Sequence, residues 1–243
     1  MLTAIDSFCS IVVVIMLYRW VSLHQLLVKP LLFHIANLLF LLGMTPWLDS
    51  VARYSIWLHS TQSVIVHHIA PLLWIMALRH SVPMDVDSER NRPSWKITTL
   101  LVVFALLTWL WMLPAVHPLL MQSAIAYSGM KWLMAMSGIA LCLTMLTHHV
   151  DSEYWRRLNS WTVTLPLVSL GVLMVTIPDI YQSAHANMHH HHMMMANVPE
   201  SLQFDSYSDQ LLGGMIFLLA ASIYWQKDML SRGFSGHTRS VTE

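Results

Sequence analysis

Residues 55–78 form an apolar segment that carries three histidines and a glutamine: Ser55-Ile-Trp-Leu-His-Ser-Thr-Gln-Ser-Val-Ile-Val-His-His-Ile-Ala-Pro-Leu-Leu-Trp-Ile-Met-Ala-Leu78. The segment is long enough to cross a membrane as a helix. Ionisable groups at membrane depth are costly, and they usually face the interior of a helix bundle. At ~100° per residue, His59 and Gln62 share one side of this helix. His67 lies ~80° away, about 12 Å further along the axis, and His68 points roughly opposite to His59. We therefore expect two separate polar stations, one near an interface at His59 and one near mid-membrane at His67.

The composition of the whole chain is that of a membrane protein. Of its 243 residues, 56% are hydrophobic and 11% are charged, against about 25% charged in soluble domains. The formal net charge is zero, which gives no indication of nucleic-acid binding. The two cysteines, Cys9 and Cys142, have no CxxC spacing, so neither a disulfide framework nor a zinc ribbon is expected.

Seven apolar segments predict an all-α, polytopic membrane fold with seven transmembrane helices. The first segment lacks a basic leader and a small-residue cleavage site, and we interpret it as a retained span rather than a signal peptide. The seven are Leu2–Tyr18, Leu31–Leu48, Ile56–Leu78, Ile97–Leu113, Met130–Leu146, Trp161–Ile177 and Gln210–Trp225.

The distribution of basic residues predicts the orientation. With alternating loops, every lysine and arginine except Arg53 and Lys131 falls on one side. Cytoplasmic loops carry this excess of basic residues, so the N-terminus is predicted outside and the C-terminus inside. We expect residues 1–243 to form a single transmembrane domain, with an outer loop at 178–209 and a short cytoplasmic tail at 227–243.

The outer loop contains a tract of five histidines and four methionines within eleven residues. Short histidine-rich tracts are typical of metal binding. Zinc would use the imidazoles but not the thioethers, whereas thioether and imidazole together suit copper, and Cu(I) in particular. The predicted ligands of the tract are His185, Met188, His189, His190, His191, His192, Met193, Met194 and Met195.

Further metal-ligand candidates lie in or near the predicted spans. They are His59, Gln62 and His67 in the third span, His117 in the loop after the fourth span, and Asp209 at the start of the seventh. Methionine also fills irregular gaps in apolar cores, so the methionines within spans are equally well explained by packing. No serine-histidine-aspartate arrangement, Walker loop or zinc-protease motif stands in a plausible context, and we predict that the chain is not an enzyme.

Several stretches together resemble the CtaG-like cytochrome c oxidase assembly proteins of bacterial membranes. The family's third-span pattern, His-x-x-Gln-His followed by Ala-Pro-Leu-Leu, is similar to His59-Ser-Thr-Gln62-Ser63 and Ala70-Pro71-Leu72-Leu73 here. The other resembling stretches are Thr45-Pro46-Trp47-Leu48-Asp49, Met130-Lys131-Trp132, Asp179-Ile-Tyr181 and Ser208-Asp209-Gln210-Leu-Leu-Gly-Gly214.

The sequence departs from the family pattern at several positions. Ser63 stands where a histidine usually follows the glutamine, and a His-x-x-Glu-His element found in many members would fall on Tyr127, Met130 and Lys131. If those family residues are metal ligands, this chain has kept His59 and lost several partners, and the His/Met tract is a candidate replacement.

The resemblance implies a copper chaperone or assembly factor of the bacterial inner membrane, multi-pass and in contact with lipid. It would deliver Cu(I) to a heme-copper terminal oxidase, with oxidase subunits or a periplasmic copper carrier as partners. Two alternatives remain at this point. A Cu(I) transporter would need a ligand ladder that continues through His67, and a heme-handling protein would use His59 or His67 as an axial ligand.

We predict that reporter fusions after residue 190 will report an extracytoplasmic position, because only that orientation places eleven of the thirteen basic residues inside. Fusions after residue 85 serve as the control and should report the cytoplasm. A cytoplasmic position for residue 190 would contradict copper delivery from the outer face.

Overall fold

The computed structural model describes residues 2–23, 29–78, 95–147, 153–181, 199, 202 and 204–237. The described part of the chain is helical and contains no β-strand. Its elements are α1 (Leu2–Leu23), α2 (Pro30–Gly43), α3 (Pro46–Ala52), α4 (Ile56–Ser63), η1 (Val64–Ile69), α5 (Ala70–Leu78), α6 (Trp95–Met112), α7 (His117–Gln122), α8 (Ala124–Thr147), α9 (Glu153–Thr176) and α11 (Ser206–His237).

The all-α class is confirmed, and six of the seven apolar segments expected to span the membrane fall on continuous helical stretches to within one residue. The expected span Leu31–Leu48 is wrong as a single helix, because α2 ends at Gly43 and α3 begins at Pro46 after a bend of 56°. Among the described residues, three helices are long and apolar enough to cross a membrane: Thr3–Leu23, Ile56–Leu78 and Ala124–Thr144. The bent pair α2 and α3 makes a fourth candidate if it counts as one span. The apolar parts of α6 and α9 are shorter, at Thr98–Met112 and Ser160–Thr176. Seven spans and the N-out orientation stay predictions.

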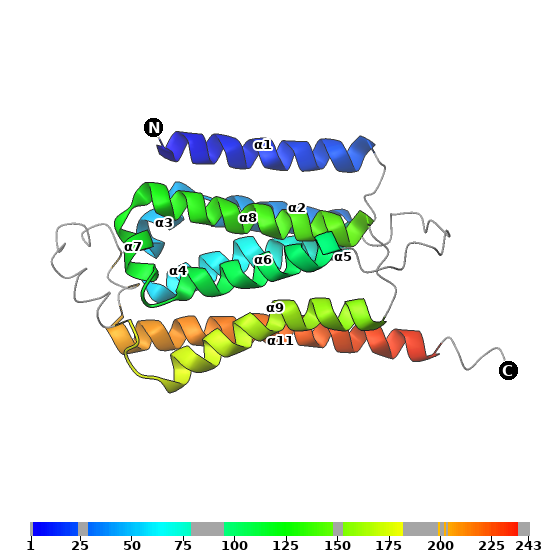
Figure 1. The fold of residues 1–243 in the computed structure, drawn as a ribbon. Helices are drawn as coiled ribbons and strands as arrows, with labels where there is room; N and C mark the ends of the chain where they lie inside the picture. Colours follow the sequence, from blue (N-terminus) through cyan, green and yellow to red (C-terminus); the bar gives the residue numbers. More distant parts are fainter. Residues whose placement is uncertain are drawn as a thin grey trace.

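The long helices run alongside one another, and α1 lies at one side of the bundle with α9 and α11 at the other (Figure 1). Helices α9 and α11 pack along each other, α6 contacts α8 and α9, and α5 contacts α2 and α8. The short helices α3 and α7 lie at the end where α1 begins, and α11 ends at the opposite end (Figure 1). We refer to the first of these ends as the α7 end.

A proline produces the bend between α2 and α3. Thr45 has an extended backbone, with φ −66° and ψ 136°, and Pro46 opens α3. A residue before proline is pushed out of the helical region, which explains why the helix cannot continue here. The axis turns by 56°, and Asp49 of α3 contacts Lys131 of α8.

The helix that carries the three histidines is not a uniform α-helix. Its middle, Val64–Ile69, is a π-helix that includes His67 and His68. A π-helix has more residues per turn than an α-helix. The side-chain directions calculated at ~100° per residue therefore do not hold beyond Ser63. The side chains of His67 and His68 are both fully buried, and their ring centroids lie 4.7 Å apart.

Glycines allow close approach of α9 and α11 at the α7 half of the bundle. A Cβ on Gly171 would lie 2.9 Å from the carbonyl oxygen of Gly214, and one on Gly214 would lie 3.0 Å from that of Gly171. Backbone atoms cannot move aside as flexible side chains do. Small residues are the usual means of close helix contact in membranes.

We predict that Gly171→Ala will lower the thermal stability of the purified protein, because overpacking typically costs about 1–3 kcal/mol. Gly129→Ala is the matched control. Nothing lies within 4 Å of a Cβ at this helical position, so it should be neutral or stabilising by up to about 1 kcal/mol. Equal melting temperatures for the two variants would show that the glycine contact between α9 and α11 is not tight.

Candidate functional site

His59 lies at the α7 end in a cage of aromatic rings. Its own ring is fully buried and stacks on Trp111, with centroids 4.6 Å apart. The ring of His117 approaches edge-on at 5.1 Å, and Tyr127 lies at 5.7 Å. Helices α4, α6, α7 and α8 each contribute one of these rings, so the cage forms only when the four helices have packed.

The nitrogen atoms of His59 differ in their surroundings. Trp111 Nε1 donates to Nδ1 at 3.1 Å, and the hydroxyl of Tyr127 lies 3.2 Å from the same atom. Nε2 is buried and has no hydrogen-bond partner among the described residues. A buried polar atom without a partner is costly and calls for an explanation.

A chain of hydrogen bonds leads from His59 to a buried carboxylate. The Tyr127 hydroxyl donates to Oε1 of Gln62. Nε2 of Gln62 donates to Oδ1 of Asp49 at 2.6 Å and to the carbonyl oxygen of Gly43 at 2.7 Å. The side-chain amide of Gln62 is thus used at both ends, and it fixes the position of Tyr127 relative to α3.

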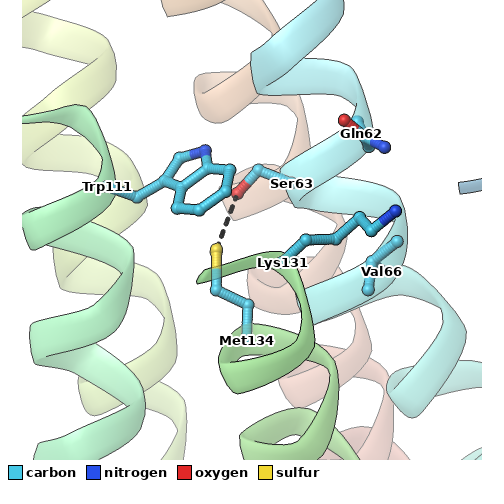
Figure 2. Close-up of a pocket in the computed structure, with 6 residues that line it drawn as sticks. All are labelled: Gln62, Ser63, Val66, Trp111, Lys131 and Met134. Carbon is cyan, nitrogen blue, oxygen red and sulfur yellow. Dashed lines mark hydrogen bonds between the residues drawn. The ribbon is translucent and has the colours of Figure 1, made fainter. Parts of the chain in front are cut away.

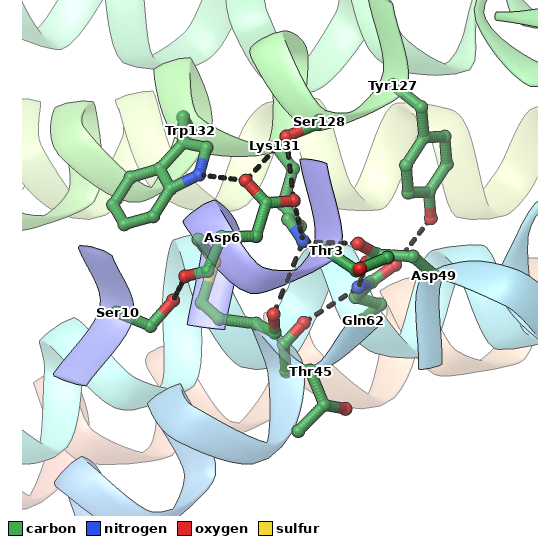
Figure 3. Close-up of polar contacts among 12 residues, drawn as sticks. Thr3, Asp6, Ser10, Thr45, Asp49, Gln62, Tyr127, Ser128, Lys131 and Trp132 are labelled. Atoms are coloured by element: carbon green, nitrogen blue, oxygen red, sulfur yellow. Dashed lines mark hydrogen bonds and ion pairs between the residues drawn. The ribbon is translucent and has the colours of Figure 1, made fainter. Parts of the chain in front are cut away.

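The chain ends in a buried ionic cluster, which we define as Lys131, Asp6 and Asp49 (Figure 3). Lys131 Nζ lies 2.5 Å from Oδ2 of Asp49 and 3.5 Å from Oδ2 of Asp6. The exposed fraction of the lysine side chain is 2%. Asp6 also accepts from Ser128 Oγ at 2.8 Å and from Trp132 Nε1 at 2.9 Å. Buried charges are tolerated only when paired and hydrogen-bonded in this manner.

A small cavity is lined by Trp111 of the His59 cage and by Lys131 of the ionic cluster, among other residues (Figure 2). It has room for about one water-sized atom, roughly 10 Å³. The side chains that line it are those of Gln62, Ser63, Val66, Trp111, Lys131 and Met134. The ammonium group of Lys131 would repel a second cation, so a water molecule suits this cavity better than a metal ion.

His67 and His68 form a separate group in the middle of the bundle, with ring centroids 4.7 Å apart. Nε2 of His67 lies 2.9 Å from Ser137 Oγ and Nδ1 lies 3.3 Å from Thr108 Oγ1. The ring stacks on Phe104 at 3.8 Å. Both nitrogens of His67 therefore have hydroxyl neighbours, as in a hydrogen-bonded core histidine.

Asp209 caps the third predicted span from another helix. Its carboxylate accepts from Ser55 Oγ at 2.8 Å, from the Ile56 N–H at 2.7 Å and from the Trp57 N–H at 3.0 Å. The first N–H groups of a helix have no intrahelical partner, and a carboxylate there also interacts favourably with the helix dipole. The structure thus assigns Asp209 a contact with the start of α4.

Tyr181 follows the end of α9 and packs against the aromatic cage on the side of His117. Its ring lies 5.2 Å from that of His117, and its hydroxyl donates to the carbonyl oxygen of Met112 at 2.5 Å. Burial raises the pKa of this hydroxyl, so Tyr181 stays a neutral donor at physiological pH. Asp179, two residues earlier, has a φ of 50°, a left-handed conformation that aspartate tolerates better than most residues.

The structure brings some of the sequence-predicted ligands together and separates others. His59, Gln62 and His117 lie at the α7 end, His67 lies deeper, and Asp209 lies at the start of α4. The tract from His185 to Met195 is outside the described residues. Within the described ranges, no group of three or more His, Cys, Asp or Glu side chains is arranged to hold a metal ion.

Three contacts of this site were not anticipated. Trp111, Tyr127 and the ion pair of Lys131 with Asp49 come from helices far apart in the sequence. A usable signal was present in the departures from the family pattern, since Tyr127 and Lys131 occupy positions of the His-x-x-Glu-His element. In the structure, Tyr127 contacts both His59 and Gln62, and Lys131 lines the same cavity as Gln62. These two positions therefore belong to the same site although their residue types differ from the family pattern.

Comparison with known families supports the resemblance. The family model of the cytochrome c oxidase caa3 assembly factor (Caa3_CtaG) matches residues 11–225. The chain belongs to this family. No match was found among curated proteins or among solved structures. The match includes every residue of the His59 cage, and of the ionic cluster it leaves out only Asp6.

We predict that Lys131→Met will destabilise the protein by roughly 3–5 kcal/mol, because it leaves the buried carboxylate of Asp6 and the partly buried carboxylate of Asp49 without their ammonium partner. Thermal unfolding in detergent measures the change. Lys29→Met is the control, since Lys29 is exposed and a surface substitution is expected to stay within about 0.5 kcal/mol. Similar unfolding temperatures for both variants would mean that the carboxylates do not depend on Lys131.

Proposed function

We propose that the chain is a non-enzymatic membrane assembly factor that binds Cu(I) at the α7 end and delivers it to a heme-copper terminal oxidase. The family match supports a role in oxidase assembly. The observation that carries the copper part is the pair of buried imidazoles, His59 and His117, with ring centroids 5.1 Å apart. Imidazole is a ligand that suits copper, and one nitrogen of the pair has no other partner among the described residues.

The position of the His/Met tract in the chain supports the same proposal. Tyr181 contacts His117, and His185 follows only four residues later. Four extended residues span at most roughly 14 Å, so the tract begins within reach of the buried pair. We propose that the tract collects Cu(I) and that the pair receives it, because a tract with nine soft or borderline ligands can exchange the ion readily.

Delivery is favoured over transport by the environment of His67. A transport path would need a ligand ladder that continues through His67, and both ring nitrogens of His67 have hydroxyl groups close by. Heme handling is a third candidate, in which His59 or His67 would be an axial ligand. Absorption in the Soret region by the purified protein would support it, and lack of that absorption would exclude it.

The proposal includes the setting in which the chain acts. It would be a multi-pass protein of the bacterial inner membrane with the α7 end outside. Its partners would be oxidase subunits or a periplasmic copper carrier, and lipid would surround its exposed apolar side chains. Nucleic acid has no place in this function.

We predict that His59→Gln will insert normally but will reduce oxidase maturation at limiting copper to the level of a deletion strain. Glutamine keeps polarity and approximate size but lacks the imidazole that a copper ligand requires. His68→Gln is the matched control, because His68 is equally buried but lies outside the His59 cage, and we expect it to retain most oxidase activity. Normal oxidase activity in the His59→Gln strain would show that the site is misplaced.

A further inference from the structure

We infer that the copper seat is Nε2 of His59 beside the ring of His117, and that it is a two-coordinate site for a monovalent ion whose charge is balanced by the ionic cluster. The inference rests on the proposed copper function and adds the atoms, the coordination and the reason for the ion's charge. Both rings are at most 1% exposed. The site is therefore enclosed by protein and is distinct from the His/Met tract.

The protons available in the cage decide which nitrogen of His59 can bind an ion. Trp111 Nε1 can only donate, so its contact with Nδ1 requires a lone pair there and places the ring proton on Nε2. The Tyr127 hydroxyl donates its single proton to Gln62. Towards Nδ1, 3.2 Å away, it can therefore only accept. The contact with Trp111 fits the tautomer with the ring proton on Nε2. The other tautomer, in which Nδ1–H donates to Tyr127, requires the Trp111 N–H to move away from Nδ1.

The tautomer satisfied by Tyr127 is the one that can bind a metal ion. With the ring proton on Nδ1 and donated to Tyr127, Nε2 carries a lone pair in a buried position without another partner. Metal-bound histidines usually donate their second ring N–H to such a partner, which fixes the tautomer. The switch from the first tautomer of His59 to the second moves one proton off Nε2 and one onto Nδ1. Binding at this seat therefore releases no net proton from His59.

The charge of the surroundings favours a monovalent ion. The ionic cluster holds two carboxylates and one ammonium group, which leaves one negative charge in excess. Hydrogen bonds through Gln62 and Tyr127 connect this charge to the ring of His59. A single positive charge on Nε2 would balance the excess charge of the ionic cluster, whereas a divalent ion would leave an uncompensated positive charge in a medium of low dielectric constant. The guanidinium of Arg53, which also acts on Tyr127, makes a divalent ion still less favourable.

The number of ligands points to the same ion. Zinc in proteins takes four ligands in a tetrahedral arrangement. The described residues offer no group of three or more His, Cys, Asp or Glu side chains here, but two imidazoles suffice for Cu(I), whose filled d shell accepts two ligands in line. Two buried imidazoles also hold such an ion less firmly than a closed four-ligand site would, as a carrier requires.

The test uses the full chain with residues 185–195 replaced by a glycine-serine linker of equal length, so that the tract contributes no ligand. Purified under anaerobic, reducing conditions, this protein is titrated with Cu(I) against a colorimetric Cu(I) chelator. We expect one Cu(I) per chain, an X-ray absorption spectrum with two nitrogen ligands and no sulfur, and an affinity for Zn²⁺ at least a hundredfold lower. His59→Gln in the same background should remove the binding.

The pair Tyr127→Phe and Tyr224→Phe tests the tautomer argument. Each substitution removes one tyrosine hydroxyl from the bundle, but only Tyr127 lies against Nδ1 of His59, whereas Tyr224 of α11 donates to the carbonyl oxygen of His68 outside the cage. Loss of a hydrogen-bond partner behind a metal ligand typically weakens binding 10–100-fold. We expect this loss for Tyr127→Phe and less than a threefold change for Tyr224→Phe. Equal effects of the two substitutions would overturn the role of Tyr127.

The outcomes separate this inference from the proposed function. If the natural chain binds Cu(I) and the linker variant does not, copper is held by the tract alone, and the buried seat is wrong while copper delivery stands. If neither protein binds Cu(I), copper delivery fails as well. Sulfur ligands in the spectrum of the linker variant, or Zn²⁺ binding as tight as Cu(I) binding, would also overturn the two-coordinate seat.

Discussion

The ion pairs of Lys131 with Asp49 and Asp6 are the constraint on which the α7 half of this molecule depends. An ammonium group inside a membrane protein is stable only next to carboxylates, and here the carboxylates come from α1 and α3. The bend at Pro46 is needed because it carries Asp49 to Lys131. The positions of α1, α3 and α8 are therefore set by charge as much as by apolar packing. Gln62 and Tyr127 extend this order to His59.

The two groups of histidines show how the same side chain serves different purposes in one helix. His67 has a hydroxyl neighbour at each ring nitrogen and an aromatic ring against its face, which satisfies the imidazole where it stands. His59 has two competing neighbours at one nitrogen and none at the other among the described residues. A satisfied imidazole stabilises the fold, whereas an unsatisfied one has binding capacity left over. An unsatisfied nitrogen alone does not make a ligand candidate, because both ring nitrogens of His68 also lack a partner among the described residues. At His59 the unsatisfied nitrogen lies in a ring that contacts a second buried imidazole, His117, whereas the imidazole next to His68 is the hydrogen-bonded His67.

The fold was predictable from sequence to the extent that single segments determine it. Apolar segments became helical because hydrophobicity and length act locally. The expected second span ran through Pro46 to Leu48, and the break there was missed although the steric restriction of the residue before a proline explains it. The glycines of α9 and α11 explain their close contact, but they do not show from sequence which helix the last one meets. The π-helix at Val64–Ile69 was not predictable, since its apolar residues fit an α-helix equally well. His59 and Gln62 were identified from their cost in a span. Trp111, Tyr127 and Asp49 were not, because no periodicity within one helix shows which other helices will lie against it.

The contact of Asp209 with the start of α4 has a consequence for biosynthesis. The carboxylate lies 154 positions downstream of the serine that it contacts, so at about 5–20 residues per second the ribosome supplies it roughly 8–30 s later. During that interval the N–H groups of Ile56 and Trp57 must bond to water or to lipid headgroups. Completion of the His59 end therefore waits for the last helix, and a chain that stops before Asp209 would leave that end open. Translation itself sets the order in which this site matures.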